Sequence, residues 1–468
     1  MSASTVAAET PTLAPILAVP VELFAEIFFH AVPDFVDTLD SYRAPRLLMH
    51  VCTRWREIVL STPRLWSSFR LDLGRKHSME DVQTTIERAG ILALSVHALL
   101  GNVRIENLED SETKLGLLRR YAPRIRRLQV DTGMLHALHD ALDCPSDRDG
   151  NGKGLKFSAL KELLHWDDSV SYDLIRKHRL SPVSFATVYG LRRVRLCKIF
   201  STCLRLPAAQ ISNIVDFEGL CGSPAELKLL LDDLPRLSVL SIELYLSEFP
   251  TTLPVIQHTE IRHLQLTLTG LRWYQANSEL DIFMFLSLPA LESINLDYRF
   301  PIHDDTFALL RDCSPHLSRL HFCPDNGFNE PAPALLRPLG ASLQTLFMTR
   351  PTLEYLDSFL ADLLGSSDGA SGYLPQLAEI HVEDLDSTHL IPFLQLAGNE
   401  ILKRRRGGVL PLQLRSLHVV ALYPETYQKL VLPDKVAELL RELREGGMEI
   451  VVVLRTRYDG TGDHSVHF

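Results

Sequence analysis

The chain has 468 residues and a formal net charge of -10, and it is 46% hydrophobic and 23% charged. Because nucleic-acid-binding domains usually carry an excess of basic residues, this acidic balance predicts no nucleic-acid partner. No uncharged apolar run approaches the ~20 residues that a membrane-spanning helix needs, so we expect no membrane insertion. Seven cysteines without a CxxC pair favour a reducing compartment. Since the N-terminus also lacks the features of a targeting peptide, we expect a cytoplasmic or nuclear protein.

Residues 17–66 have the periodicity of short amphipathic helices, and they follow a polar tail, 1–16, that we expect to be disordered. Apolar residues in the first helix recur at the spacing of one helical face: Pro20, Leu23, Phe24, Ile27, Phe28 and Ala31. A second run has the same spacing and ends near Pro63: Leu48, Val51, Cys52, Trp55, Ile58 and Val59. The spacing predicts a module of three short helices that is too small to be stable without a neighbour or partner.

Three blocks of this module resemble the F-box family in order and spacing. They are Val19-Pro20-x-Glu22-Leu23-x-x-x-Ile27, Leu48-x-x-Val51-Cys52-x-x-Trp55-x-x-Ile58 and Pro63-x-Leu65-Trp66. The chain departs from the family pattern at Val19, where leucine is usual, and in the long link 34–43, which is similar to that of many fungal F-box proteins.

The resemblance implies that residues 17–66 bind a Skp-type adaptor, which in turn binds a cullin scaffold. The residues expected to contact the adaptor are Val19, Pro20, Leu23, Ile27, Leu48, Val51, Cys52 and Trp55. A different interpretation is that these helices form an N-terminal cap that seals the repeats which follow.

Residues 67–454 repeat the pattern Leu-x-x-Leu-x-Leu about a dozen times. Clear copies begin at residues 125, 191, 237, 261, 291, 317, 343, 377 and 414, and weaker ones at 91, 160 and 211. The intervals between the five copies from 237 to 343 are 24, 30, 26 and 26 residues, close to the leucine-rich-repeat period. The pattern predicts an α/β leucine-rich-repeat solenoid of horseshoe form, with a parallel sheet on its concave face. Return segments would cover the outside, one of them a helix at 356–364, and the tail 455–468 would be loose.

Residues that alternate with the buried strand positions should point to the concave face and could contact a protein substrate. The candidate substrate-binding residues are Arg127, Arg193, Arg195, Gln265, Asn295, Arg319, His321, Phe347, His381 and His418. This row is basic at its start and rich in histidine near its end. The three histidines lie on strands too far apart to ligate one metal ion, since neighbouring strands are ~4.8 Å apart.

Motifs of catalysis and cofactor binding are missing from the sequence. The run from Asp147 to Gly152 starts like a calcium loop, but Ser158 stands where such a loop needs glutamate. No P-loop, GxSxG, HExxH or GxGxxG occurs, so we expect no catalytic residue, cofactor or metal. The basic run from Lys403 to Arg406 is interpreted as an exposed loop, with a nuclear-import signal as the alternative.

These features predict a non-enzymatic substrate-recognition adaptor of a Skp-cullin-F-box ubiquitin ligase. Its F-box would bind the Skp-type adaptor, and its repeats would bind a protein substrate that the sequence does not identify. The alternative is a leucine-rich-repeat scaffold that binds partners without a role in ubiquitin transfer.

Overall fold

The computed structural model describes residues 19–32, 45–72, 79–99, 116–131, 134, 157–165, 183–184, 188, 190–200, 204–205, 211–245, 255–269, 282–296, 310–312, 314–324, 336–363, 374–407, 413–423, 432–456 and 463–467. The predicted N-terminal tail 1–16, the link 34–43 and the run from Asp147 to Gly152 lie outside these residues.

The chain divides into two compact units. The first runs to Cys197 and takes in residues 203–210, while the second contains 198–202 and everything from Ile211 onward. The described strands of each unit pair in parallel and are connected through helices or turns, except for one antiparallel pair near the end of the second unit. This α/β arrangement is consistent with the leucine-rich-repeat solenoid that the sequence predicts.

The first unit opens with helices and continues as a parallel sheet. Its helical segments are α1 (Val21–Ala31), η2 (Leu47–His50), α2 (Thr53–Ser61), η3 (Pro63–Trp66), α3 (Met79–Arg88) and η5 (Ala122–Arg124), where η marks a 3₁₀ helix. Its main strands pair in the order β1 (Ser68–Asp72), β2 (Leu94–Leu99), β3 (Ile125–Val130), β4 (Glu162–His165) and β6 (Arg193–Phe200), of which residues up to Cys197 belong to this unit. All these pairings are parallel, and β5 (Val183–Ser184) and β7 (Leu204–Arg205) form a separate pair.

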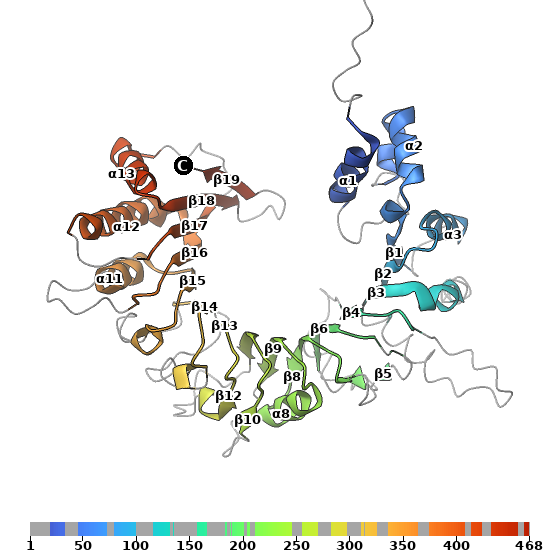
Figure 1. Ribbon diagram of the computed structural model, residues 1–468, viewed down its shortest axis with the longest axis horizontal. Helices are drawn as coiled ribbons and strands as arrows, with labels where there is room; N and C mark the ends of the chain where they lie inside the picture. Colours follow the sequence, from blue (N-terminus) through green and yellow to red (C-terminus); the bar gives the residue numbers. More distant parts are fainter. Residues whose placement is uncertain are drawn as a thin grey trace, which may run out of the picture. The chain divides into compact units, whose positions relative to one another are not determined.

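The second unit continues the same alternation. Its main strands pair in the order β8 (Asp216–Cys221), β9 (Val239–Tyr245), β11 (His263–Thr269), β13 (Ser293–Leu296), β14 (Arg319–Phe322), β15 (Thr345–Thr349), β16 (Glu379–Asp386), β17 (Ser416–Tyr423), β18 (Glu449–Thr456) and β19 (Asp463–His467). The connecting helices are α8 (Pro224–Asp233), η8 (Ile282–Phe285), η9 (Arg337–Leu339), α11 (Leu353–Leu363), α12 (Ser387–Gly407) and α13 (Asp434–Glu445), and β10 (Ile256–Gln257) pairs with β12 (Leu286–Ser287). In Figure 1, α11, α12 and α13 lie together on one side of the strands β15 to β18.

The core of each repeat consists of the three apolar positions of the predicted pattern. In the copy at residue 317, Leu317, Leu320 and Phe322 are completely buried, whereas Arg319 is exposed and His321 is half-buried. Burial of each such side chain stabilises the fold by about 1.5–3 kcal/mol relative to exposure. The alternation along the strand therefore sends the polar positions to the opposite face.

A ladder of backbone hydrogen bonds joins the repeats just before their strands. The amide of Arg262 donates to Ser238 O (2.9 Å), that of Glu292 to Arg262 O (2.9 Å), and that of Ser318 to Glu292 O (2.9 Å). The same contact continues through Gln344 (2.8 Å) and Ala378 (2.7 Å). These bonds satisfy backbone groups that the turns would otherwise leave unpaired, so they fix the register of each new strand.

The weaker copies show where the pattern misled the prediction. The copy expected at Ile211 is wrong by three residues, because Phe217 pairs with Leu240 and Ile214 takes the first buried position. Gly219 occupies the third buried position of this copy, where the pattern has leucine, so the copy is hard to recognise in the sequence. In the copy at residue 91, Ile91 is 97% exposed, although Leu94 and Val96 are buried.

Two further expectations are wrong for the residues described. The tail 455–468 was expected to be loose, but residues 463–467 form β19, which pairs antiparallel with β18. The run from Lys403 to Arg406 was expected to be a loop, but it lies in the last turns of α12. The helix expected at 356–364 is confirmed as α11. No helix in the described part of the chain is both long and apolar enough to cross a bilayer.

Candidate functional site

Helix α1 has one apolar face turned inward and another turned outward. Phe24 and Phe28 are buried and contact Trp55 of α2, with ring centroids 5.8 and 4.8 Å apart. Leu23 and Ile27, one position before each phenylalanine, are both 55% exposed. Because residues four apart lie on the same helical face, Leu23 and Ile27 form an outward apolar pair.

The segment before α2 also turns apolar side chains outward. Val51 is 57% exposed and Leu47 is similarly accessible, whereas Ile58 and Val59 of α2 are buried. Across the described residues, eleven large hydrophobic side chains are exposed, and six of them belong to residues 21–60: Val21, Leu23, Ile27, Leu47, Val51 and Leu60. Exposed apolar groups are therefore concentrated in the N-terminal helices, and such concentrations mark interaction surfaces.

The residues predicted to contact an adaptor fall into two groups. Pro20, Leu23, Ile27 and Val51 are exposed, and Val19, Leu48, Cys52 and Trp55 are half-buried. Three of the second group make internal contacts, since Val19 O accepts from Arg54 Nη2 (2.7 Å) and Cys52 Sγ accepts from the amide of Trp55 (3.5 Å). Trp55 is half-buried, and its ring packs against both phenylalanines and joins α1 to α2.

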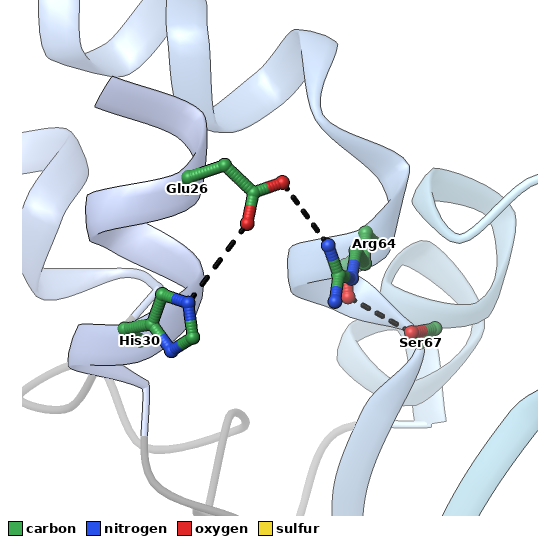
Figure 2. Close-up of polar contacts among 4 residues, drawn as sticks. All are labelled: Glu26, His30, Arg64 and Ser67. Atoms are coloured by element: carbon green, nitrogen blue, oxygen red, sulfur yellow. Dashed lines mark hydrogen bonds and ion pairs between the residues drawn. The ribbon is translucent and has the colours of Figure 1, made fainter. Parts of the chain in front are cut away.

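Polar contacts connect α1 to the start of the sheet (Figure 2). Glu26 of α1 accepts a hydrogen bond from Arg64 Nη1 (3.1 Å), and its other oxygen lies 4.0 Å from His30 Nε2. Ser67, directly before β1, donates its hydroxyl to Arg64 O (2.8 Å). Arg64 also stacks over the ring of Phe29 at 3.5 Å. These contacts are exposed and individually weak, but together they orient α1 relative to the first strand.

Buried residues strengthen this junction. Trp66 is completely buried and donates its indole N–H to Val59 O (2.9 Å). Arg46 pairs with Asp81 of α3 at 2.9 Å, and Arg88 of α3 lies over the Trp66 ring. The N-terminal helices and the first repeat therefore share one packed junction within the first unit.

The strand face of the first unit is strongly basic. The structure places Arg127, Glu162 and Arg193 in register on β3, β4 and β6, and it aligns Gln129, Leu164 and Arg195 two residues further on. Glu162 Oε2 lies 3.5 Å from both Arg127 Nε and Arg193 Nη1. One carboxylate thus lies between two of the predicted arginines.

In the second unit, four of the predicted residues form a ladder of rings across adjacent strands: His321, Phe347, His381 and His418. The ring centroids of Phe347 and His381 are 4.1 Å apart, and those of His381 and His418 are 4.5 Å apart, with both pairs stacked. His321 lies 5.6 Å from Phe347, and its Nε2 is hydrogen-bonded to Thr349 Oγ1 (2.6 Å). Gln265 and Asn295 continue this alignment on the two preceding strands, and Arg319 lies two residues before His321 on β14, paired with Ser293.

The pKa of His381, in this ladder of rings, is lower than that of a free imidazole. Burial lowers the pKa of His381, and the charge of a protonated His418 lowers it further. Glu379 and Glu383 act in the opposite direction, and Glu379 Oε2 lies 3.6 Å from His381 Nε2. A stack of aromatic and imidazole rings is consistent with a surface that contacts planar or apolar groups.

The backbone is strained near the ends of β15 and β16, the strands that carry Phe347 and His381. Arg350 and Asp384 have φ angles of 53° and 55°, which non-glycine residues rarely adopt. Their side chains form an ion pair (3.4 Å), and the Arg350 amide donates to Glu383 O (2.8 Å). The register of β16 against β17 shifts between Val382 and Leu385. Strain of this kind is often retained next to functional surfaces.

Several residues of these surfaces escaped the sequence prediction. Glu162 lay in a degraded copy, and its third buried position is His165 instead of leucine. His97, aligned with Gln129, was also missed. Burial lowers the pKa of His97 to about 4, and the charge of Arg70 contributes in the same direction. Cross-strand alignment would have identified both residues once the phase of the weak copies was known.

The described residues contain no group of three or more His, Cys, Asp or Glu side chains placed to hold a metal ion. Cys52, Cys221 and Cys323 lie outside any disulfide bond, and the last two are buried. At the end of α12, Lys403 pairs with Glu400 (3.7 Å) and Arg406 pairs with Glu442 of α13. At least two cations of this basic run thus have partners within the protein.

No protein-family model matches the chain, and no curated protein shows significant similarity to it in sequence.

Proposed function

We propose that this protein is a substrate-recruiting adaptor of a cullin-type ubiquitin ligase. In this proposal the N-terminal helices act as an F-box that binds a Skp-type adaptor, and the strand face of the repeats binds a protein substrate. The chain itself would carry out no bond chemistry. Its contribution would be to hold a substrate at high effective concentration beside a charged conjugating enzyme.

The observation that carries the proposal is the exposed apolar surface of the N-terminal helices. Leu23 and Ile27 face outward on the helix that uses Phe24 and Phe28 for its core. A helix that served only as a cap for the repeats would turn its longest apolar side chains toward them. The exposed pair also falls on two positions of the F-box-like block Val19-Pro20-x-Glu22-Leu23-x-x-x-Ile27.

Affinity capture tests the proposal directly. The full-length chain is expected to co-purify with a Skp-type adaptor and a cullin, and the double variant Leu23→Ala/Ile27→Ala is expected to lose both. Because these side chains are more than half exposed, the variant should keep the fold of the unit. Leu229→Ala is a matched control, since Leu229 of α8 is an exposed leucine in the second unit.

Retention of the adaptor by the control and its loss by the double variant would support the proposal. If the unmodified chain captures neither adaptor nor cullin, the ligase role fails and a repeat scaffold without ubiquitin transfer becomes the better description.

A further inference from the structure

The first unit carries a dense row of cations where β3, β4 and β6 begin. Beside the aligned residues Arg127 and Arg193 stand Arg126, Lys161 and Arg192, one position earlier in each repeat. Their backbones are directly linked, because the Lys161 amide donates to Arg126 O (2.8 Å) and the Arg192 amide to Lys161 O (2.8 Å). Side chains on neighbouring strands lie ~4.8 Å apart, so these charges reinforce one another.

The composition of this row differs from that of the rest of the sheet. The second, third and fifth pattern positions of these three strands hold six cations and one carboxylate: Arg126, Arg127, Lys161, Arg192, Arg193 and Arg195 against Glu162. The corresponding positions of the second unit hold three arginines and five carboxylates: Arg262, Arg319 and Arg415 against Asp216, Glu218, Glu292, Glu379 and Glu449. In a chain of net charge -10, such an excess of positive charge at these strand positions is found only in the first unit among the residues that the structure describes.

One carboxylate of the protein already lies within this row. The Glu162 carboxylate lies 3.5 Å from each of two arginines, and the side chains of Arg127, Glu162 and Arg193 are all less than half exposed. Arg126, Lys161, Arg192 and Arg195, by contrast, are exposed. Guanidinium groups bind carboxylates in planar, directional pairs, so exposed arginines beside an existing pair suit further carboxylates.

We infer that this basic strand face, defined as Arg126, Arg127, Lys161, Arg192, Arg193 and Arg195, binds a carboxylate-rich segment of a partner protein. The inference deepens the proposed function. It rests on that function in one respect, which is that the partner is the substrate of the ligase. An acidic segment would align two or more carboxylates across β3, β4 and β6. Its binding would depend on charge and would weaken as salt is added.

The inference is tested with the full-length chain and a labelled peptide in which glutamate alternates with serine. Fluorescence anisotropy should show binding of this peptide and no binding of the matched peptide with glutamine for glutamate. The double variant Arg192→Glu/Arg195→Glu should weaken binding about tenfold or more, since two favourable pairs become repulsive. Arg236→Glu/Arg415→Glu is the matched control, because it reverses two exposed arginines of the second unit that lie outside the candidate substrate-binding set.

Several outcomes would overturn the inference. They are equal binding of the glutamine peptide, an equal loss in the control variant, and binding only of a phosphoserine peptide or of a single-stranded oligonucleotide. The milder variant Arg192→Gln/Arg195→Gln gives the same test if charge reversal disturbs folding. Adaptor capture is measured separately, so a chain that binds the acidic peptide without capturing a Skp-type adaptor would sustain this inference and refute the ligase role.

Discussion

The two faces of α1 predict opposite consequences for two neighbouring substitutions, Phe28→Ala and Ile27→Ala. Phe28 is buried, and its ring lies 4.8 Å from that of Trp55 and 5.6 Å from that of Phe24. Truncation to alanine removes this packing and leaves a cavity between α1 and α2. Buried Phe→Ala changes cost about 3–5 kcal/mol, so we expect a loss of this size in the local stability of the helices.

Ile27 lies one position earlier, but its side chain is 55% exposed. Complete burial of an isoleucine contributes about 1.5–3 kcal/mol, and only about half of that is at stake at this position. Alanine also has the higher helix propensity, which offsets a few tenths of a kcal/mol. We therefore expect Ile27→Ala to cost less than about 1 kcal/mol, while it impairs capture of the adaptor.

Hydrogen exchange of the backbone amides of residues 21–61 measures the local stability. Phe28→Ala should accelerate exchange in this segment by roughly a hundredfold or more, and Ile27→Ala by less than tenfold. The amides of β11 in the second unit provide an internal reference that should not change. Equal acceleration by both variants, or protection that survives Phe28→Ala, would refute the assignment of the two faces.

Three other predictions follow from packing and protonation. Gly398→Ala should destabilise the protein by about 1–3 kcal/mol in urea denaturation, because the added methyl group overlaps Leu439 of α13. Gly116→Ala is the control: its methyl group meets no atom, so this variant should be neutral or stabilising. The pKa of His97 is about 4 in the folded state and 6.5 in the unfolded state, so the unfolded state binds more protons between these pH values. The free energy of unfolding should therefore fall as the pH decreases from about 6.5 to 4. In His97→Gln, the urea concentration at the unfolding midpoint should fall less over this pH range. The pKa of His381, measured by NMR, should lie below 6.5 and should rise in His418→Gln, which removes a repulsive charge; an unchanged pKa would contradict the contact within the ladder.

The sequence predicted the register of the clear repeats because the repeated pattern itself determines that register. Leucines at fixed intervals enter the core, and the residues between them must align across the strands. The alignment of Gln265, Asn295, His321 and Phe347 is confirmed for this reason. The pattern failed where a buried position was held by a residue other than a large apolar one, as at Gly219.

Contacts that depend on where neighbouring elements lie could not be predicted in this way. Helical periodicity identified an apolar face on α1, but only the position of α2 decides that Phe24 is inside and Leu23 outside. To predict that Glu162 pairs with both Arg127 and Arg193, one would have to know how the weak repeat at residue 160 aligns with its neighbours. Strand β19 has the polar sequence Asp-His-Ser-Val-His and pairs through its backbone, so hydrophobic periodicity gave no signal for it.

The two proposed binding surfaces use different physical chemistry, and this makes them separable by experiment. The N-terminal helices expose leucine, isoleucine and valine, whose association depends on burial of apolar surface and resists salt. The basic strand face presents exposed guanidinium groups, whose attraction to an acidic segment is screened within about 10 Å at moderate ionic strength. We therefore expect high salt to release an acidic peptide while the adaptor stays bound. Loss of both at the same salt concentration would mean that the two surfaces do not act independently.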